Sequence, residues 1–363
     1  MSGPVAIQAL VTGLATGAAY GLIALGFTLA WRLTSTLAFA HGDIVTAAVF
    51  VGVLAVVGTT PVAIPLGAGE TVALTAVTIA AGAALSIAVY ALAVRPFAHR
   101  ESAWGRAAVL RPKAAGGAGA RGVAGTAAGG AAARRAGGAF ARLAAPLRAG
   151  GSAHSAAGGA FLARLATAPD LRRGALGWVA GGLAAGLLVR ELLGLVFTQQ
   201  AYALPDPLGS PGVLSLGEIT VPVRALEVLV IGLAVGVAVE RALALTGAGT
   251  VMRAVADDAG AAALLGVPTE KVVLIAFGIA GALAGLAGLL IAPQAPIGLE
   301  DGVLLGLKGM AAALLFRLGS VRLAIAGGLV VGAAEGLIVA QFGARWGDMA
   351  ILAALAVLAS RRR

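Results

Sequence analysis

Residues 5–31 read VAIQALVTGLATGAAYGLIALGFTLAW, an apolar run without a single charged side chain. About 20 apolar residues suffice to cross the hydrocarbon core of a bilayer as an α-helix. The run has neither a basic leading segment nor a cleavage-site pattern, so we expect a retained span and not a removed signal peptide. The whole chain agrees, because 60% of its 363 residues are hydrophobic and 12% are charged, against roughly 25% charged in soluble domains. The sequence therefore predicts an all-α polytopic bundle of transmembrane helices and excludes a soluble enzyme.

Similar apolar runs recur to the end of the chain. After the first they cover residues 44–66, 71–94, 176–197, 222–246, 272–292, 303–316, 321–341 and 347–360. Two of them, 303–316 and 347–360, are short for a span, so we expect eight or nine spans. Basic residues collect in alternate connections, from Arg32 to Arg361–Arg363. Because cytoplasmic loops carry the excess of Lys and Arg, this bias predicts the N-terminus outside and the C-terminus in the cytoplasm.

The chain divides into three parts by composition. Residues 1–96 and 176–363 hold the apolar runs, whereas residues 97–175 are mostly Ala, Gly and Arg in low-complexity order. Such a stretch lacks the large apolar side chains that offset the entropy of ordering, so we expect a largely disordered cytoplasmic insertion. The net charge of +10 indicates basic cytoplasmic loops that contact anionic membrane lipids, and not a nucleic-acid partner.

Glycines at three- or four-residue spacing predict where helices pack closely. They form three ridges: Gly13, Gly17 and Gly21; Gly278, Gly281, Gly285 and Gly288; and Gly328, Gly332 and Gly336. Small residues at this spacing let helix backbones approach one another in lipid.

Chemistry that needs thiols, metals or bound nucleotide has no support in the sequence. The chain has no cysteine, and its histidines are scattered at His41, His99 and His154 without metal-ligand spacing, so no cofactor is predicted. No G-x-x-x-x-G-K-[ST] motif occurs, so any ATP would be bound by another polypeptide. Paired carboxylates and nucleophile–base arrangements are also missing, which disfavours an embedded enzyme.

Polar side chains inside apolar spans are candidates for a translocation path, because burying them in a bilayer is costly. The first group lies between the first two spans, where His41 could titrate near neutral pH and Asp43 could favour a helix start; a simple cap and tight turn is the alternative. Glu191, beside Arg190, and Glu335 are further candidates, although their positions favour structural pairing or hydrogen bonding over a role in the path. The path candidates are Phe39, His41, Gly42, Asp43, Glu191 and Glu335; Glu227, Glu240 and Lys308 stand singly.

The cytoplasmic loop 248–270 contains an amphipathic segment between two spans. Residues 252–268 are expected to form a short helix that ends at Gly266, with Pro268 preventing its continuation. Its charged face, at Arg253, Asp257 and Asp258, would meet the cytosol or a partner protein.

Several motifs, in order, resemble the membrane permeases of branched-chain amino acid ABC transporters. AAYGLIALG at 18–26 followed by LAFAHGD at 37–43 is similar to the family's opening helix and its N-F-A-H-G-[DE] element. Arg95-Pro96 resembles the end of its third helix. The R-A-x-A-x-[DN] loop is matched at 253–258, and the G-S…G-G…G-x-x-E tail is matched at 319–335. Ala38 stands where the family commonly has Asn, and Phe316-Arg317 stand where it has Gly-Gly.

The resemblance implies a permease subunit in a bacterial cytoplasmic membrane, working with two ABC ATPase subunits, a second permease subunit in a homo- or heterodimer and an extracytoplasmic solute-binding protein. It implies an ATPase-coupling loop, with Arg253, Asp257, Asp258, Leu265 and Gly266, and a gate or turn. The gate or turn comprises Phe316, Arg317, Gly319 and Ser320.

Other functions remain open from the sequence. A related permease for ribose-like sugars, urea or short amides fits the same pattern. An autonomous secondary transporter or channel would instead cluster ionisable residues at mid-bilayer. A non-transporting scaffold would use the basic insertion to recruit lipid or protein.

Overall fold

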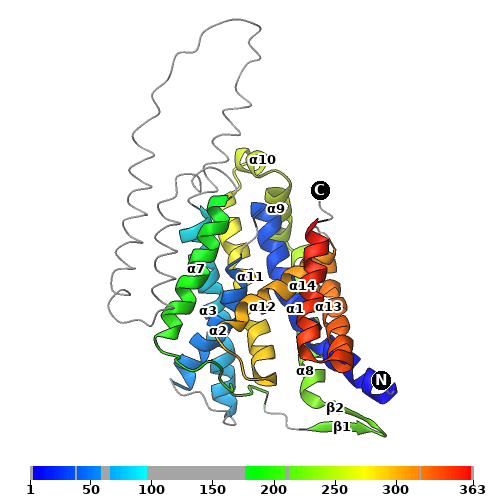
Figure 1. Cartoon of the computed structure of the whole chain (residues 1–363). Helices are drawn as coiled ribbons and strands as arrows, with labels where there is room; N and C mark the ends of the chain where they lie inside the picture. The colour runs from blue at the N-terminus through cyan, green and yellow to red at the C-terminus, as the bar shows by residue number, and fades with distance from the viewer. Residues whose placement is uncertain are drawn as a thin grey trace, which may run out of the picture.

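The structure is a computed structural model that describes residues 3–36, 39–58, 66–95, 176–208, 212–316, 318 and 320–360. The described residues form a bundle of long helices (Figure 1). Each predicted apolar run is a helix in it: α1 Gly3–Thr34, α2 His41–Val56, α3 Ala68–Val89, α7 Leu176–Gly194, α8 Val223–Leu245, α11 Thr269–Ile291, α12 Asp301–Leu315, α13 Val321–Phe342 and α14 Ala344–Ser360. The prediction of an all-α polytopic membrane protein is confirmed.

Among the described residues, five helices are long and apolar enough to cross a bilayer on their own. They are α1, α3 with its π-helical end Tyr90–Val94, α8, α11 with the 3₁₀ turn Ala292–Gln294, and α13; α2 is a shorter apolar helix. The number of spans and the orientation of the termini stay predictions. The proposed insertion, 97–175, lies outside the described residues.

Helix α1 is one of the two most buried of these five helices and packs against α8, α11, α12 and α13. Its glycine ridge meets the ridge of α13: a Cβ added at Gly17 would lie 2.7 Å from the carbonyl oxygen of Gly328, and one added at Gly13 would lie 2.5 Å from that of Gly332. Only glycine permits this backbone contact. The predicted close packing of the two ridges is confirmed.

Helix α11 is the second central element and packs against α1, α2 and α3. Gly281 lies against Gly82 of α3, Gly285 against the Thr78 carbonyl, and Gly288 against Val45 of α2. The predicted glycine ridge of α11 therefore also brings helix backbones together. With α1, it gives the bundle a tightly packed centre.

The two ends of the bundle differ (Figure 1). One end carries the start of α1 and a hairpin of β1 Val213–Leu216 and β2 Ile219–Pro222, antiparallel with Val213 opposite Pro222. This hairpin, which turns at Gly217 with a φ of 64°, was not predicted from the sequence. The other end carries the end of α14 and two short helices, α9 Gly247–Asp257 and α10 Ala259–Leu264.

Candidate functional site

The start of α2 lies where several helices converge. Gly42 packs against α12 so closely that a Cβ there would lie 2.9 Å from the Cα of Gly306. Beside it, the His41 ring meets Phe27 of α1 edge to face, with 4.6 Å between ring centroids. Helix α7 brings a glycine, Gly186, against the carboxylate of Asp43. Residues from α1, α7 and α12 thus surround the first turn of α2.

Two polar atoms in this turn are buried without a partner. Within the described part of the chain, His41 Nε2 and Asp43 Oδ1 have no hydrogen bond, and the two residues are 2% and 6% exposed. Leaving such groups unpaired in the interior is unfavourable, so each of the two atoms is a candidate to bind a polar group. Arg190 of α7 acts on the Asp43 carboxylate electrostatically, and the predicted pairing of Arg190 or Glu191 with another span is consistent with this.

The remaining path candidates from the sequence fall in different places. Phe39 is half-buried in the turn just before α2, whereas Glu191 is exposed on α7 and is not brought to the α2 start. Glu335 is on α13 and belongs to a separate cluster.

That second cluster joins three helices through one lysine. Lys308 of α12 is 6% exposed, and its Nζ lies 2.6 Å from Glu335 Oε1 and 2.7 Å from Asp348 Oδ1 of α14. The Nζ also lies 5.7 Å from the ring centroid of Tyr20 on α1, where a cation is attracted to the face of the ring. The lysine therefore links α12, α13 and α14 and faces α1.

The sequence indicated only part of this cluster. It gave Glu335 and Lys308 as single residues and missed Tyr20 and Asp348. The lysine itself could have indicated the cluster, because a cation in an apolar helix requires a counter-charge from another helix. Asp348, the acid of the final apolar helix, was a candidate for that counter-charge.

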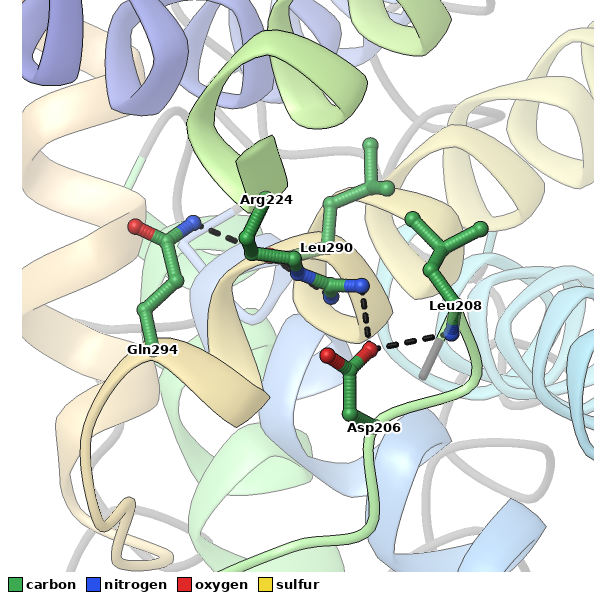
Figure 2. Close-up of polar contacts among 5 residues, drawn as sticks. All are labelled: Asp206, Leu208, Arg224, Leu290 and Gln294. Atoms are coloured by element: carbon green, nitrogen blue, oxygen red, sulfur yellow. Dashed lines mark hydrogen bonds and ion pairs between the residues drawn. The ribbon is translucent and has the colours of Figure 1, made fainter. Parts of the chain in front are cut away.

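A third polar group braces the hairpin end of the bundle (Figure 2). Arg224, in the first turn of α8, forms an ion pair with Asp206 in the connection after α7. Asp206 also accepts a hydrogen bond of 2.9 Å from the Leu208 amide. The carbonyl of Leu290 accepts from Arg224 at 3.5 Å and from Gln294 at 3.0 Å. The arginine thus ties the α7–β1 connection to the end of α11.

The predicted cytoplasmic helix is two helices with a break at Asp258. The Asp258 side chain accepts from the amides of Gly260 at 2.8 Å and Ala261 at 2.9 Å, and so caps α10. A side-chain oxygen competes with a continuous helix in this way, which is why the expectation of one helix was wrong. The end at Gly266, with a φ of 85°, is as predicted.

The exposed surface of this segment is apolar at its tip. Leu264 is 91% exposed and Leu265 is 85% exposed, while Met252 and Val255 on the inner face of α9 are buried. Arg253 donates to the Leu243 carbonyl at 2.7 Å and to Thr250 at 3.0 Å, which holds α9 against the end of α8. Asp257 is exposed. Two exposed leucines on a braced hairpin of helices are suited to dock another protein.

The predicted gate or turn joins α12 to α13. Phe316 ends α12 and is half-buried, and Ser320 precedes α13 without a side-chain cap. Arg317 and Gly319 lie outside the described residues. Between them Leu318 is 1% exposed and has a φ of 52°, which is unusual for a residue with a Cβ.

Nothing in the described parts of the chain forms a cluster that could hold a metal ion.

A comparison with known protein families shows which family the chain belongs to. The sequence model described as "Branched-chain amino acid transport system / permease component" matches residues 117–360, more than half of the chain. The chain belongs to this family. The matched part of the permease contains the α9–α10 segment, the Lys308 cluster and the α12–α13 turn, whereas the α2 motif that suggested the family lies before it. A multi-pass protein of the inner membrane follows from the family and the apolar helices.

Curated relatives agree with the family. Permease proteins named LivH of high-affinity branched-chain amino acid transport systems in Salmonella typhimurium and Escherichia coli K12 are each 36% identical over 108 residues. BraD of Pseudomonas aeruginosa is 35% identical over 102 residues. These matches span 28–30% of this chain and about a third of each relative, 33–35% of its length. No solved structure matches the chain.

Proposed function

We propose that the chain is the membrane subunit of an ABC importer for branched-chain or other small amino acids. ATP would be hydrolysed on separate subunits, and a second permease subunit and an extracytoplasmic binding protein would complete the transporter. The N-terminus and the hairpin end would face outward, and the α9–α10 end and the insertion 97–175 would face the cytoplasm. Family membership and the LivH and BraD relatives support the class of substrate.

The observation that carries the proposal is the α9–α10 segment. It projects from one end of the bundle (Figure 1), with Leu264 and Leu265 almost fully exposed at its tip. Neighbouring apolar side chains exposed on a projecting segment are a candidate contact for a protein partner. An ATPase that docked on them would move the tip, and α9 would transmit the movement to α8 through the Arg253 hydrogen bond to Leu243.

The path would pass the start of α2. His41 and Asp43 offer a buried nitrogen and oxygen without partners in the described part of the chain. Phe27 adds an apolar surface against the His41 ring. A zwitterionic amino acid with an apolar side chain has matching chemistry. We place the path at this turn and not at Glu191, which is exposed.

The experiment begins with the tagged chain, gently solubilised from its host, and mass spectrometry of the proteins that remain bound. We expect a P-loop ATPase among them, and its loss from Leu264→Asp/Leu265→Asp because charged residues do not enter an apolar pocket. Val213→Asp, on an apolar residue 61% exposed at the hairpin end, is the matched control. Equal ATPase recovery from both variants would refute the docking surface.

The autonomous transporter has one specific observation in its favour. Lys308, Glu335 and Asp348 do form a cluster of ionisable residues among apolar helices, as a proton- or ion-coupled carrier would require. Leucine counterflow into proteoliposomes that hold the purified chain alone distinguishes the two. Uptake that a pH gradient drives without ATPase would favour the carrier over the importer.

A further inference from the structure

The end of the bundle at α9 contains a cavity with a strong positive bias. It has a volume of about 210 Å³ and lies between the ends of α1 and α8, helix α9 and the start of α13. Its charged lining residues are Arg32, Arg253, Arg322 and Glu240. Three arginines against one glutamate give this end of the bundle an excess of positive charge, which attracts anionic groups.

Within the described parts of the chain, the hydrogen bonds of these arginines leave donors free. Arg322 pairs with Glu240 at 2.7 Å through Nε alone, and Arg253 uses one donor each on Leu243 and Thr250. Arg32 is half-buried. Guanidinium groups with free donors recognise phosphate through paired hydrogen bonds.

The cavity adjoins an apolar groove on the outside of the bundle. The groove has a volume of about 550 Å³, lies between α8 and α13, and shares Glu240, Ala244 and Arg322 with the cavity. From there it continues along the two helices past Val237 and Leu329. Both helices are membrane-span candidates that bury only a small part of their surface inside the chain, so the groove faces the lipid.

We propose that the groove and cavity together bind one anionic phospholipid, with an acyl chain between α8 and α13 and its phosphate among Arg32, Arg253 and Arg322. A single such molecule supplies both the apolar and the anionic part, and basic pockets between membrane helices are known to take anionic headgroups. A second copy of the chain seated in the groove would cover the apolar walls but leave the arginines without an anion. Lipid binding at this place does not depend on which solute is transported.

The bound lipid would have a structural consequence. Its phosphate would touch α1, α9 and α13 at once, and so would hold α9 in place from the membrane side. The coupling segment proposed above would then be anchored by Arg253 both to α8 and to the lipid.

The test is native mass spectrometry of the purified full chain with equal amounts of phosphatidylglycerol and phosphatidylcholine of the same acyl chains. We expect preferential retention of phosphatidylglycerol, falling about fivefold for each arginine removed in Arg32→Gln and Arg322→Gln. In Arg322→Gln, Glu240 still has a cationic partner, because Arg241 lies 3.4 Å away. Arg345→Gln, in the first turn of α14 and so beyond the opposite end of α13, is the control with the same change of charge and should leave retention unchanged.

A groove variant separates the lipid from a free anion. Ala326→Trp fills the apolar wall and removes no charge, so it should lower phosphatidylglycerol retention while inorganic phosphate binding is unaltered. Equal retention of the two lipids by the unchanged chain, or retention that survives Arg32→Gln/Arg322→Gln, would overturn the proposal. The chain has no cysteine, so a disulfide-linked dimer of Val237→Cys without bound lipid would assign the groove to a second copy instead.

Discussion

The replacement Lys308→Met tests whether the three-helix ion cluster stabilises the bundle. Methionine keeps the length of the side chain but removes the cation, so Glu335 and Asp348 lose their shared counter-charge. The Lys308 and Glu335 side chains are 8% and 13% exposed, and that of Asp348 is 39% exposed. A buried pair that loses one partner costs about 3–5 kcal/mol, whereas an exposed pair contributes at most about 1 kcal/mol.

The magnitudes therefore rank the variants. Lys308→Met should lower the free energy of unfolding by about 3–5 kcal/mol, and Asp348→Asn by about 1 kcal/mol or less. Lys308→Met combined with Glu335→Gln should cost less than Lys308→Met alone, because the uncompensated carboxylate in the interior is gone. The control is Lys271→Met, an exposed lysine at the start of α11, which should stay within about 0.5 kcal/mol.

The assay is reversible unfolding in mixed micelles by titration with dodecyl sulfate, followed by far-ultraviolet circular dichroism. If Lys308→Met and Lys271→Met unfold at the same point, the cluster contributes nothing and the reasoning fails. If the double variant lowers the free energy of unfolding by the sum of the two single effects, Lys308 and Glu335 act independently. That result would contradict the direct interaction expected from their 2.6 Å contact.

Three further predictions concern other parts of the chain. Gly42→Leu should prevent α2 from packing on α12, because even a Cβ has no room there; a monodisperse peak with unchanged yield on fluorescence-detected size exclusion would disprove it. Arg224→Gln should loosen the α7–β1 connection by removing its ion pair with Asp206, seen as faster amide hydrogen exchange in residues 199–208, and exchange equal to that of the unchanged chain would count against the brace. Arg95→Gln should change the free energy of unfolding by at most about 1 kcal/mol, since its pair with Glu270 is 50% and 39% exposed; a larger loss in the same titration would contradict this.

The sequence predicted the helices and their close contacts well, because both depend on local patterns. Apolar length placed every described long helix, and glycine spacing identified the faces of α1 and α13 that meet. The hydrogen bonds that side chains form within a loop were harder to predict, as Asp258 shows. Its side chain competes with the backbone for hydrogen bonds, and only the geometry of its neighbours decides between one helix and two.

Pairing across the bundle could not be predicted from one sequence. Lys308 and Asp348 are 40 positions apart, and their contact depends on how α12 and α14 are rotated about their axes. The same holds for the surroundings of Asp43, to which α7 contributes Gly186. The hairpin 213–222 was missed because four-residue strands between apolar helices leave only a weak alternating pattern.

The contact between the glycines of α1 and α13 has a consequence for how the protein can move. Backbone atoms pressed together without intervening side chains leave no rotamers to rearrange, so neither helix can slide along the other without separating the interface over its whole length. The two helices should therefore travel as one rigid body in any conformational cycle. The shear must occur where side chains intervene, such as the boundary between α8 and α13, and distances between labels on α1 and α13 should stay constant while those across that boundary change.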